Sequence, residues 1–344
     1  VTSRYMLPAC LVLLTISTDF KEILKLGSKA VIMFLTGTVG ILIGGPIAIL
    51  FFSYVAPSVI GAESEEVWRG MTTVAGSWIG GGANQAAMKE VFQVDDNLFS
   101  KMVTVDIIVA NIWMAFLLIG AGKSKLMDKY LNADSSAIEE VKNKMEKYSA
   151  SISKIPTLSD LMIILAVGFG VTGFAHLVSD WIAPYLLENY PGLKQYSLTS
   201  GFFWLIVIST TMGLILSFTR LRKLEGVGAS KVGSIFIYLL VATIGMKMNV
   251  LAIFESPGLF LVGIVWMLVH ISLLLIVAKI IRAPFFFVAV GSQANVGGAA
   301  SAPVMASAFH PSLAPVGVLL AVLGYALGTY AAYLCGILMQ YVSQ

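Results

Sequence analysis

Two segments rich in glycine and in amide side chains carry the residue types in this sequence that could do chemistry. The first, residues 71–88, contains Gly81, Gly82, Asn84 and Gln85. The second, residues 285–309, contains Ser292, Gln293, Asn295, Gly297, Gly298 and Ser301. Amide groups donate and accept hydrogen bonds without the cost of a buried charge, and glycine lets the backbone approach a ligand closely. These residues therefore predict a binding site for a small solute or ion.

The composition indicates that the chain lies in a membrane. Hydrophobic residues make up 58% of its 344 residues and charged residues 12%, about half of the charged fraction in soluble domains. The net charge of +3 comes with no basic stripe, which argues against a nucleic-acid partner. Cys10 and Cys335 lie in apolar runs and predict neither a disulfide nor a metal site. No metalloprotease or nucleophile motif is present, so we expect neither an enzyme nor a cofactor.

Apolar runs predict the spanning helices. A span needs about 20 mostly apolar residues. Six runs are near or above this length, and two shorter ones could extend at their polar ends: 31–55, 102–121, 161–182, 202–218, 259–281 and 316–338, with 6–16 and 234–246. The sequence thus predicts an all-α, multi-pass protein of the inner membrane with about eight spanning helices around the two glycine-rich segments.

Lysine and arginine predict how these helices are oriented. The basic edges at 21–29, 122–159, 220–231 and 279–282 are expected in the cytoplasm, whereas 56–69 and 187–195 are expected outside. Residues 31–55 then run outward, and 102–121 must run inward. The segment 71–88 between them must enter and leave on the outer side, as a re-entrant or broken helix. The same count predicts that 285–309 is re-entrant from the cytoplasm.

The chain also contains a weak internal repeat. Residues 14–17 correspond to 242–245, and 76–84 correspond to 291–299. The two halves start on opposite sides, which predicts an inverted-repeat transporter fold. We expect a first repeat at 1–121, a cytoplasmic linker at 122–158, and a second repeat with its leading helices at 159–344. An alternative is that the glycines only permit close helix packing, although packing alone does not explain amide residues in both segments.

Broken helices inside a bilayer suit ion and solute binding. Their loose carbonyls suit a sodium ion and their helix N-termini suit an anionic group, so a sodium site is predicted near Asn84 and Asn295. Asp106 lies inside the run 102–121. An intramembrane carboxylate is a candidate proton relay or cation ligand. The alternative, a carboxylate wetted by the loop that contains Asp95 and Asp96, remains open at this point.

Three motifs resemble a bacterial membrane-protein family known as domain of unknown function 819. They are IMFLTGTVGILIGGP at 32–46, GSWIGGGANQAAM at 76–88 and GSQANVGGAASAP at 291–303. The resemblance covers essentially the whole chain. It implies membership of the cation:proton antiporter and anion transporter superfamily, whose proteins use inverted repeats and elevator-like or rocking motions. Family members look longer at the N-terminus, so we expect Val1 to begin a fragment.

These observations together predict a secondary active transporter. It would move a small polar or anionic solute by alternating access, coupled to sodium or protons. Its partners would be that solute and the lipid bilayer, and a homodimer stays open. The alternative is an uncoupled channel or exporter, although no ring of charges or carbonyls of the kind that lines channels stands out.

Overall fold

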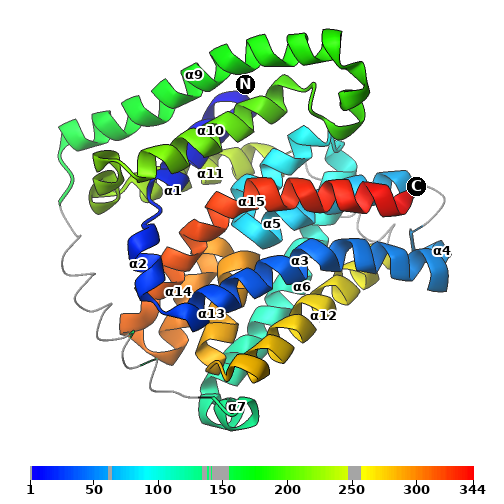
Figure 1. Ribbon diagram of the computed structural model, residues 1–344, viewed down its shortest axis with the longest axis vertical. Helices are drawn as coiled ribbons and strands as arrows, with labels where there is room; N and C mark the ends of the chain where they lie inside the picture. Colours follow the sequence, from blue (N-terminus) through cyan, green and yellow to red (C-terminus); the bar gives the residue numbers. More distant parts are fainter. Residues whose placement is uncertain (1, 61–63, 134–137, 139–140, 142–154, 247–256) are drawn as a thin grey trace.

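The computed structural model describes residues 2–60, 64–133, 138, 141, 155–246 and 257–344, and the secondary structure of these residues is entirely helical (Figure 1). The α-helices are α1 (Thr2–Ile16), α2 (Phe20–Lys25), α3 (Ser28–Val55), α4 (Pro57–Ile60), α5 (Ser64–Val91), α6 (Asp96–Gly122), α7 (Ser124–Leu131), α9 (Leu158–Asn189), α10 (Gly201–Ser217), α11 (Ala229–Gly245), α12 (Gly258–Ile281), α13 (Phe285–Val296), α14 (Gly298–Phe309) and α15 (Ala314–Ser343). Short 3-10 helices η1 (Pro191–Tyr196), η2 (Arg220–Val227) and η4 (Pro311–Leu313) join some of them.

Five helical segments of the described chain are long and apolar enough to cross a membrane: α3, α6, α9, α12 and Pro311–Ser343, which contains α15. A sixth is obtained if α10 and η2, bent by 95°, count as one span. The predicted runs 6–16 and 234–246 form α1 and α11, which have 15 and 17 residues. At 1.5 Å per residue these are about 22–26 Å long, shorter than a bilayer core of about 30 Å. Only five or six of the eight predicted spans are therefore long and apolar enough to cross a membrane in the part of the chain that the structure describes.

The helices form two bundles. Helices α1, α9, α10 and α11 lie together in the upper part of Figure 1, and α3, α5, α6 and α12–α15 lie below them. Helix α15 contacts the upper bundle through hydroxyl groups: Thr329 lies 3.2 Å from Thr210, and Tyr330 lies 2.7 Å from Thr211. The glycine-rich segments thus belong to one bundle, which touches the other through these hydroxyl groups and through the rings of Tyr333 and Phe203, 4.8 Å apart.

The first glycine-rich segment is a helical hairpin, which we call the first hairpin. Helix α5 is broken at Gly80 and at Gly81, whose φ of 72° and ψ of −173° lie outside the helical region. The two legs fold back on each other, because the rings of Trp68 and Phe92 are 5.9 Å apart and Arg69 Nη1 donates to the Phe92 carbonyl at 3.5 Å. The chain therefore returns to the end of the molecule at which the hairpin starts, and the hairpin is longer than 71–88. The side of the membrane on which it opens stays a prediction.

Helices α13 and α14 form the second hairpin. The break lies at Gly297 and Gly298, and Gly298 has a φ of 56°. The ring of Phe309 lies 6.3 Å from that of Phe285 and 5.2 Å from that of Phe286, so the ends of the hairpin are adjacent. Each leg has 12 residues and is about 18 Å long, enough to reach the middle of a bilayer. The pairing of 76–84 with 291–299 sets Gly81 against Val296, so this break lies two residues later than the pairing predicts.

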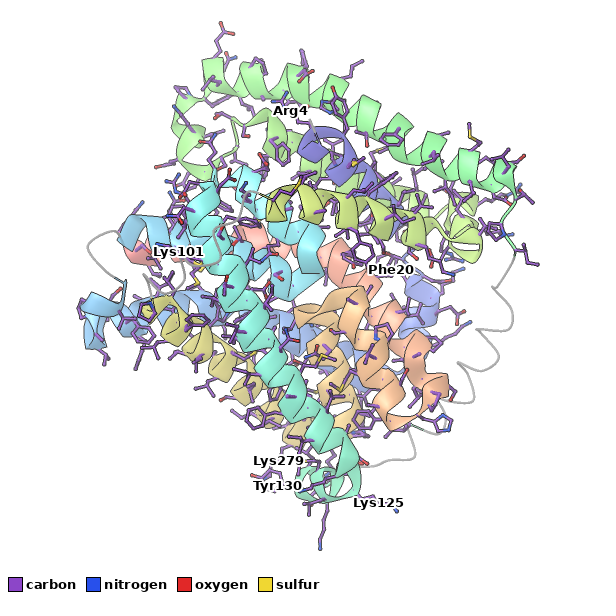
Figure 2. All side chains as sticks on the ribbon, turned by 180° about the vertical axis from the view of Figure 1, so that it is seen from behind. Arg4, Phe20, Lys101, Lys125, Tyr130 and Lys279 are labelled. Carbon is purple, nitrogen blue, oxygen red and sulfur yellow. The ribbon has the colours of Figure 1, made fainter. Side chains whose placement is uncertain are left out.

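The second hairpin opens on the face where the predicted basic edges gather. Lys29 Nζ donates to the Arg282 carbonyl at 3.0 Å, and the backbone N–H of Phe285 donates to Asp128 at 2.7 Å. Figure 2 shows Lys125, Tyr130 and Lys279 together at this end, far from Arg4. Lys279 Nζ lies 4.9 Å from the centre of the Tyr130 ring. Three basic edges that are distant in the sequence thus share one face, as the orientation prediction requires.

The first hairpin opens on the opposite face, beside residues 187–200. A hollow of about 430 Å³ lies there, lined by Trp68, Arg69, Phe92, Lys194 and Gln340 among others. The amide of Gln340, near the end of α15, donates to the carbonyl of Gln195 at 3.2 Å. The two hairpins therefore enter the molecule from opposite ends.

Helix α15 packs closely against both hairpins. A Cβ at Gly317 would lie 2.4 Å from the carbonyl carbon of Ala302 in α14, and a Cβ at Gly336 would lie 2.5 Å from the ring of Phe92. In the same way, Gly291 of α13 lies against the backbone of Met33 in α3. The packing interpretation of the small residues is thus correct for these glycines. It does not account for Gly81 and Gly298, which have positive φ at the breaks.

Candidate functional site

The tips of the two hairpins meet. A Cβ at Gly298 would lie 3.7 Å from the Cα of Gly81 and 3.7 Å from the hydroxyl oxygen of Tyr325. A Cβ at Gly81 would lie 3.5 Å from Cε1 of the same tyrosine. Both glycines adopt positive φ, which other residues rarely do. The two breaks, which are distant in the sequence, therefore form one site beside the middle of α15.

The ends of four helix segments converge at this site. The first leg of each hairpin ends here, since a Cβ at Gly324 would lie 2.9 Å from the carbonyl oxygen of Ala294 and 3.3 Å from that of Ile79. The second legs start here, at Gly82 and Gly298. The first turn of a helix leaves N–H groups without intrahelical partners and carries partial positive charge, while the last turn carries partial negative charge. The site thus combines both kinds of backbone group.

Asp106 joins the two legs of the first hairpin to α6. Its carboxylate accepts hydrogen bonds from the Ser77 hydroxyl at 2.7 Å, from Trp78 Nε1 at 2.7 Å and from Gln85 Nε2 at 3.0 Å. The residue is only 6% exposed. It lies ten positions after Asp96, the start of α6, which is about 15 Å along the helix axis. The interpretation of Asp106 as a carboxylate wetted by the preceding loop is therefore wrong.

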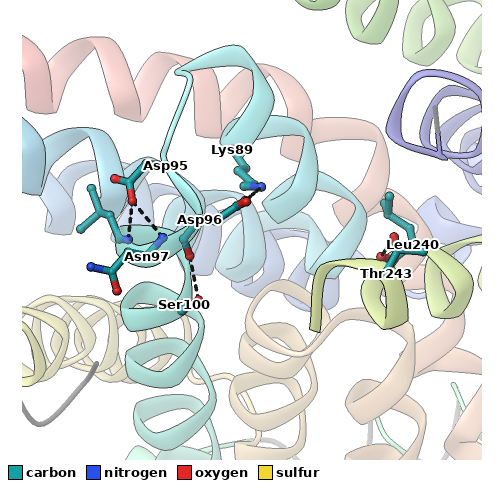
Figure 3. A network of polar contacts seen from close by, with 8 residues as sticks. Lys89, Asp95, Asp96, Asn97, Ser100, Leu240 and Thr243 are labelled. Carbon is teal, nitrogen blue, oxygen red and sulfur yellow. Dashed lines mark hydrogen bonds and ion pairs between the residues drawn. The ribbon is translucent and has the colours of Figure 1, made fainter. Parts of the chain in front are cut away.

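The start of α6 is fixed against the first hairpin, as Figure 3 shows. Asp95 caps the helix by accepting from the backbone N–H of Asn97 at 2.9 Å. Lys89, in the second leg of α5, forms an ion pair with Asp96. The Ser100 hydroxyl donates to the Asp96 carbonyl at 2.7 Å. These contacts hold α6 in register with the hairpin and place Asp106 opposite its polar side chains.

The two predicted asparagines hold the hairpin tips to neighbouring helices. Asn84 donates to the carbonyl four residues earlier at 3.3 Å and accepts from the Thr329 hydroxyl of α15 at 2.7 Å. Asn295 donates to the carbonyl four residues earlier at 2.9 Å and accepts from the Thr38 hydroxyl of α3 at 2.7 Å. Both side chains are fully buried. Their polar atoms thus already have protein partners, and the sodium site near them stays a prediction.

Ser292 belongs to a closed network in the second hairpin. It lies 2.8 Å from His270 Nε2 and accepts from Trp113 Nε1 at 2.8 Å. The other ring nitrogen of His270 lies 3.0 Å from the Gly37 carbonyl. Because a carbonyl only accepts, this nitrogen carries the proton, and Ser292 donates to the other one. The network anchors the second hairpin to α3, α6 and α12.

Gln293 differs from the other predicted residues because part of its side chain is free. Its Oε1 accepts from the Ser301 hydroxyl at 2.8 Å and lies 3.0 Å from where a Cβ of Gly297 would be. Its Nε2 is buried and has no hydrogen-bond partner among the described residues. The amide therefore sits at the tip of the second hairpin with both donors of its Nε2 unused.

The structure brings the predicted residues together, and adds four that were not among the predicted site residues. Thr38, Thr329 and His270 hold the hairpins, and Tyr325 lies between the tips. The signal for Tyr325 was its position between Gly324 and Gly328 in the last apolar run. No group of three or more metal-ligating His, Cys, Asp or Glu side chains occurs among the residues that the structure describes.

The comparisons with known proteins agree with the membrane interpretation. The model of a family described as "Protein of unknown function (DUF819)" matches residues 1–342. The uncharacterized membrane protein YjcL of Bacillus subtilis (strain 168) is 26% identical over 345 residues, covering 96% of this chain and 81% of that protein. Among solved structures, none matches the chain significantly. The chain therefore belongs to the DUF819 family of membrane proteins, whose function is unknown.

Proposed function

We propose that this membrane protein is a secondary active transporter of a small polar or anionic solute. The observation that carries the proposal is the contact between two broken helical hairpins that open toward opposite ends of the molecule. Irregular backbone inside a bilayer is tolerated where protein or a water-filled cavity surrounds it. Paired broken helices near the midplane are where transporters with inverted repeats bind their solutes and ions.

The arrangement of the helices supports an inverted repeat. One repeat would comprise 1–121 with the first hairpin and α6, and the other 159–344 with the second hairpin and α15, joined by the linker 122–158. In each repeat a hairpin is followed by a long apolar helix. The proposal places the protein in the inner membrane and assigns it no enzymatic activity.

Alternating access would come from movement of one bundle against the other. Both hairpins, with α3, α6, α12 and α15, would move relative to α1, α9, α10 and α11. The contacts of Thr329 and Tyr330 with α10 are hydroxyl pairs at 3.2 and 2.7 Å. Such pairs can exchange partners at a sliding surface more readily than a set of charged ones, because little charge must be desolvated.

Asp106 is the proposed coupling group. All three side chains around it donate to it, which fits an ionised carboxylate because that form only accepts hydrogen bonds. A protonated carboxyl must donate one bond, so one of the three contacts has to rearrange. Ser77 can do this by rotating its hydroxyl. Binding of a proton, or of a sodium ion that competes for the same oxygens, would therefore alter the hold of α6 on the first hairpin.

The test is transport by purified protein in proteoliposomes, read as current on a solid-supported membrane. The solutes would be small monocarboxylates as sodium salts, neutral amino acids, and sugars. Each would be applied with a sodium gradient, with a pH gradient or with neither, and protein-free liposomes serve as the control. We expect at least one solute to move only when one of the gradients is present. Flux that ignores both gradients would favour the uncoupled channel or exporter.

A further inference from the structure

We infer that the solute carries a single carboxylate, which the two helix N-termini at the hairpin tips hold together with the free amide of Gln293. The inference rests on the proposed function and names the class of its solute. It combines three observations: the contact of the breaks, the neutral side chains around them, and the unused donor of Gln293.

The backbone at the tips supplies N–H donors from two helix N-termini. Helix α14 starts at Gly298, and the second leg of α5 starts at Gly82. Because a Cβ at Gly298 would be 3.7 Å from the Cα of Gly81, the first turns of both segments lie beside each other. One N–H of α14, that of Ala299, already binds the Tyr325 hydroxyl. The N-terminus of a helix carries roughly half an elementary positive charge. The two first turns can therefore donate to one carboxylate, while the last turns of the first legs carry the opposite partial charge.

The side chains that touch the two breaks are neutral, and the nearby carboxylate of Asp106 is held by Ser77, Trp78 and Gln85. Among the described residues, those nearest to the breaks are Asn84, Gln293, Ser301 and Tyr325, all of which are neutral. Binding sites for dianions such as sulfate or phosphate usually add arginine or lysine. A monoanionic carboxylate fits this site better than a dianion, because no cationic side chain lies beside the breaks to balance a second negative charge.

Gln293 supplies a directed donor. The Ser301 hydroxyl donates to its Oε1 at 2.8 Å, which fixes the amide with Nε2 on the opposite side of the Cγ–Cδ bond from this contact. That nitrogen is buried and has no partner among the described residues. The whole side chain is only 1% exposed. Buried polar groups are nearly always hydrogen-bonded. A carboxylate oxygen only accepts hydrogen bonds and would satisfy this donor.

Tyr325 completes the set. Its hydroxyl oxygen would be 3.7 Å from a Cβ at Gly298, and its ring lies against Gly81. The hydroxyl accepts from the backbone N–H of Ala299 and keeps its own proton to donate to the second carboxylate oxygen. Because the tips touch each other, the carboxylate can enter only when they move apart, so its binding and the movement of the hairpins are linked.

The test measures the thermal unfolding of the purified full chain. Sodium salts of acetate, propionate, lactate, pyruvate, benzoate and glycine would be compared with sodium chloride of equal ionic strength. Sodium sulfate, sodium phosphate and propionamide serve as the dianionic and neutral probes. A ligand that binds the native state raises the unfolding midpoint. We expect at least one monocarboxylate to raise it to a plateau as its concentration increases, and the sulfate, phosphate and amide to give no such saturable rise.

Two matched variants assign the effect to the tip. Gln293→Leu removes the free donor, and binding of the carboxylate should weaken about tenfold or more, the loss of one hydrogen bond to a charged group. Gln340→Leu makes the same change at the rim of the protein, where the amide binds the Gln195 carbonyl, and should leave binding unchanged. Equal weakening in both variants would overturn the assignment.

The inference is also overturned if no monocarboxylate raises the midpoint, or if the dianions or propionamide raise it as much. That failure can be told apart from failure of the proposed function. A transporter of another class of solute would fail the binding test and still show gradient-driven flux. A channel for carboxylates would pass the binding test, and its flux would ignore the gradients.

Discussion

Asp106→Asn is expected to abolish ion-driven accumulation of solute and to leave the protein folded. Asparagine has the shape of aspartate and can keep an oxygen toward Trp78 Nε1, which donates to the carboxylate at 2.7 Å. Its amide nitrogen can donate to the Ser77 hydroxyl, and the Gln85 amide can turn to accept. Asparagine thus imitates the protonated carboxyl permanently. Solute exchange across proteoliposomes without a gradient should persist, while accumulation against a gradient is lost.

Two further variants separate coupling from stability. Asp106→Leu leaves three buried donors without an acceptor, at about 1–3 kcal/mol each, so the unfolding midpoint should fall sharply. Asn111→Leu changes an exposed residue of the same helix, whose side chain donates to the Ile107 carbonyl, and should behave as wild type in both assays. Accumulation by the Asp106→Asn variant at the wild-type rate would remove Asp106 from the coupling mechanism.

Gly298→Ala is expected to block solute binding at a modest cost in stability. The φ of 56° places this residue in the left-handed region, where a Cβ costs about 1–2 kcal/mol. The new methyl group would lie 3.7 Å from both Gly81 Cα and the Tyr325 hydroxyl, which is ordinary van der Waals contact. The protein should therefore fold, but the methyl group occupies the space between the tips. We expect at least a tenfold loss in transport.

Gly228→Ala is the matched control for this second prediction. Gly228 has a φ of 100°, and its nearest neighbours are side-chain carbons of Lys231 at 3.7 and 3.8 Å, in the loop before α11. The alanine substitution at this position brings similar backbone strain to a site away from the hairpins. Both variants should lower the unfolding midpoint by similar amounts, and only Gly298→Ala should lose transport. Normal transport by the Gly298→Ala variant would show that the solute does not bind between the tips.

The sequence allowed the two hairpins to be predicted because their position follows from charge and parity. The basic edges fixed the directions of the helices before and after 71–88, so this segment had to return to the side from which it started. Its glycines indicated where the helix breaks. The structure confirms that Trp68 and Phe92 are neighbours. The position of the second break was missed by two residues, since the pairing of the halves compares residue types and cannot tell which glycine of Gly297 and Gly298 takes positive φ.

The roles of the individual polar residues could not be predicted in this way. Asn84 and Asn295 were expected to bind the ligand, but their partners are Thr329 and Thr38, which lie 245 and 257 positions away in the sequence. Such partners become known only when the helices are packed. Gln293 belongs to the same kind of motif and keeps a donor free. The distinction between residues that hold the hairpins and a residue that can hold a solute therefore comes from the structure.

The central claim is that the two hairpins enter from opposite sides of the membrane, and labelling of single cysteines tests it most directly. The exposed residues Asn97, after the first hairpin, and Ala308, at the end of the second, would each be replaced by cysteine in a chain in which Cys10 and Cys335 are alanine. An impermeant maleimide is applied to intact cells and to permeabilised ones. The account predicts that Asn97→Cys is labelled in intact cells and Ala308→Cys only after permeabilisation. Labelling of both variants from the same side would contradict it.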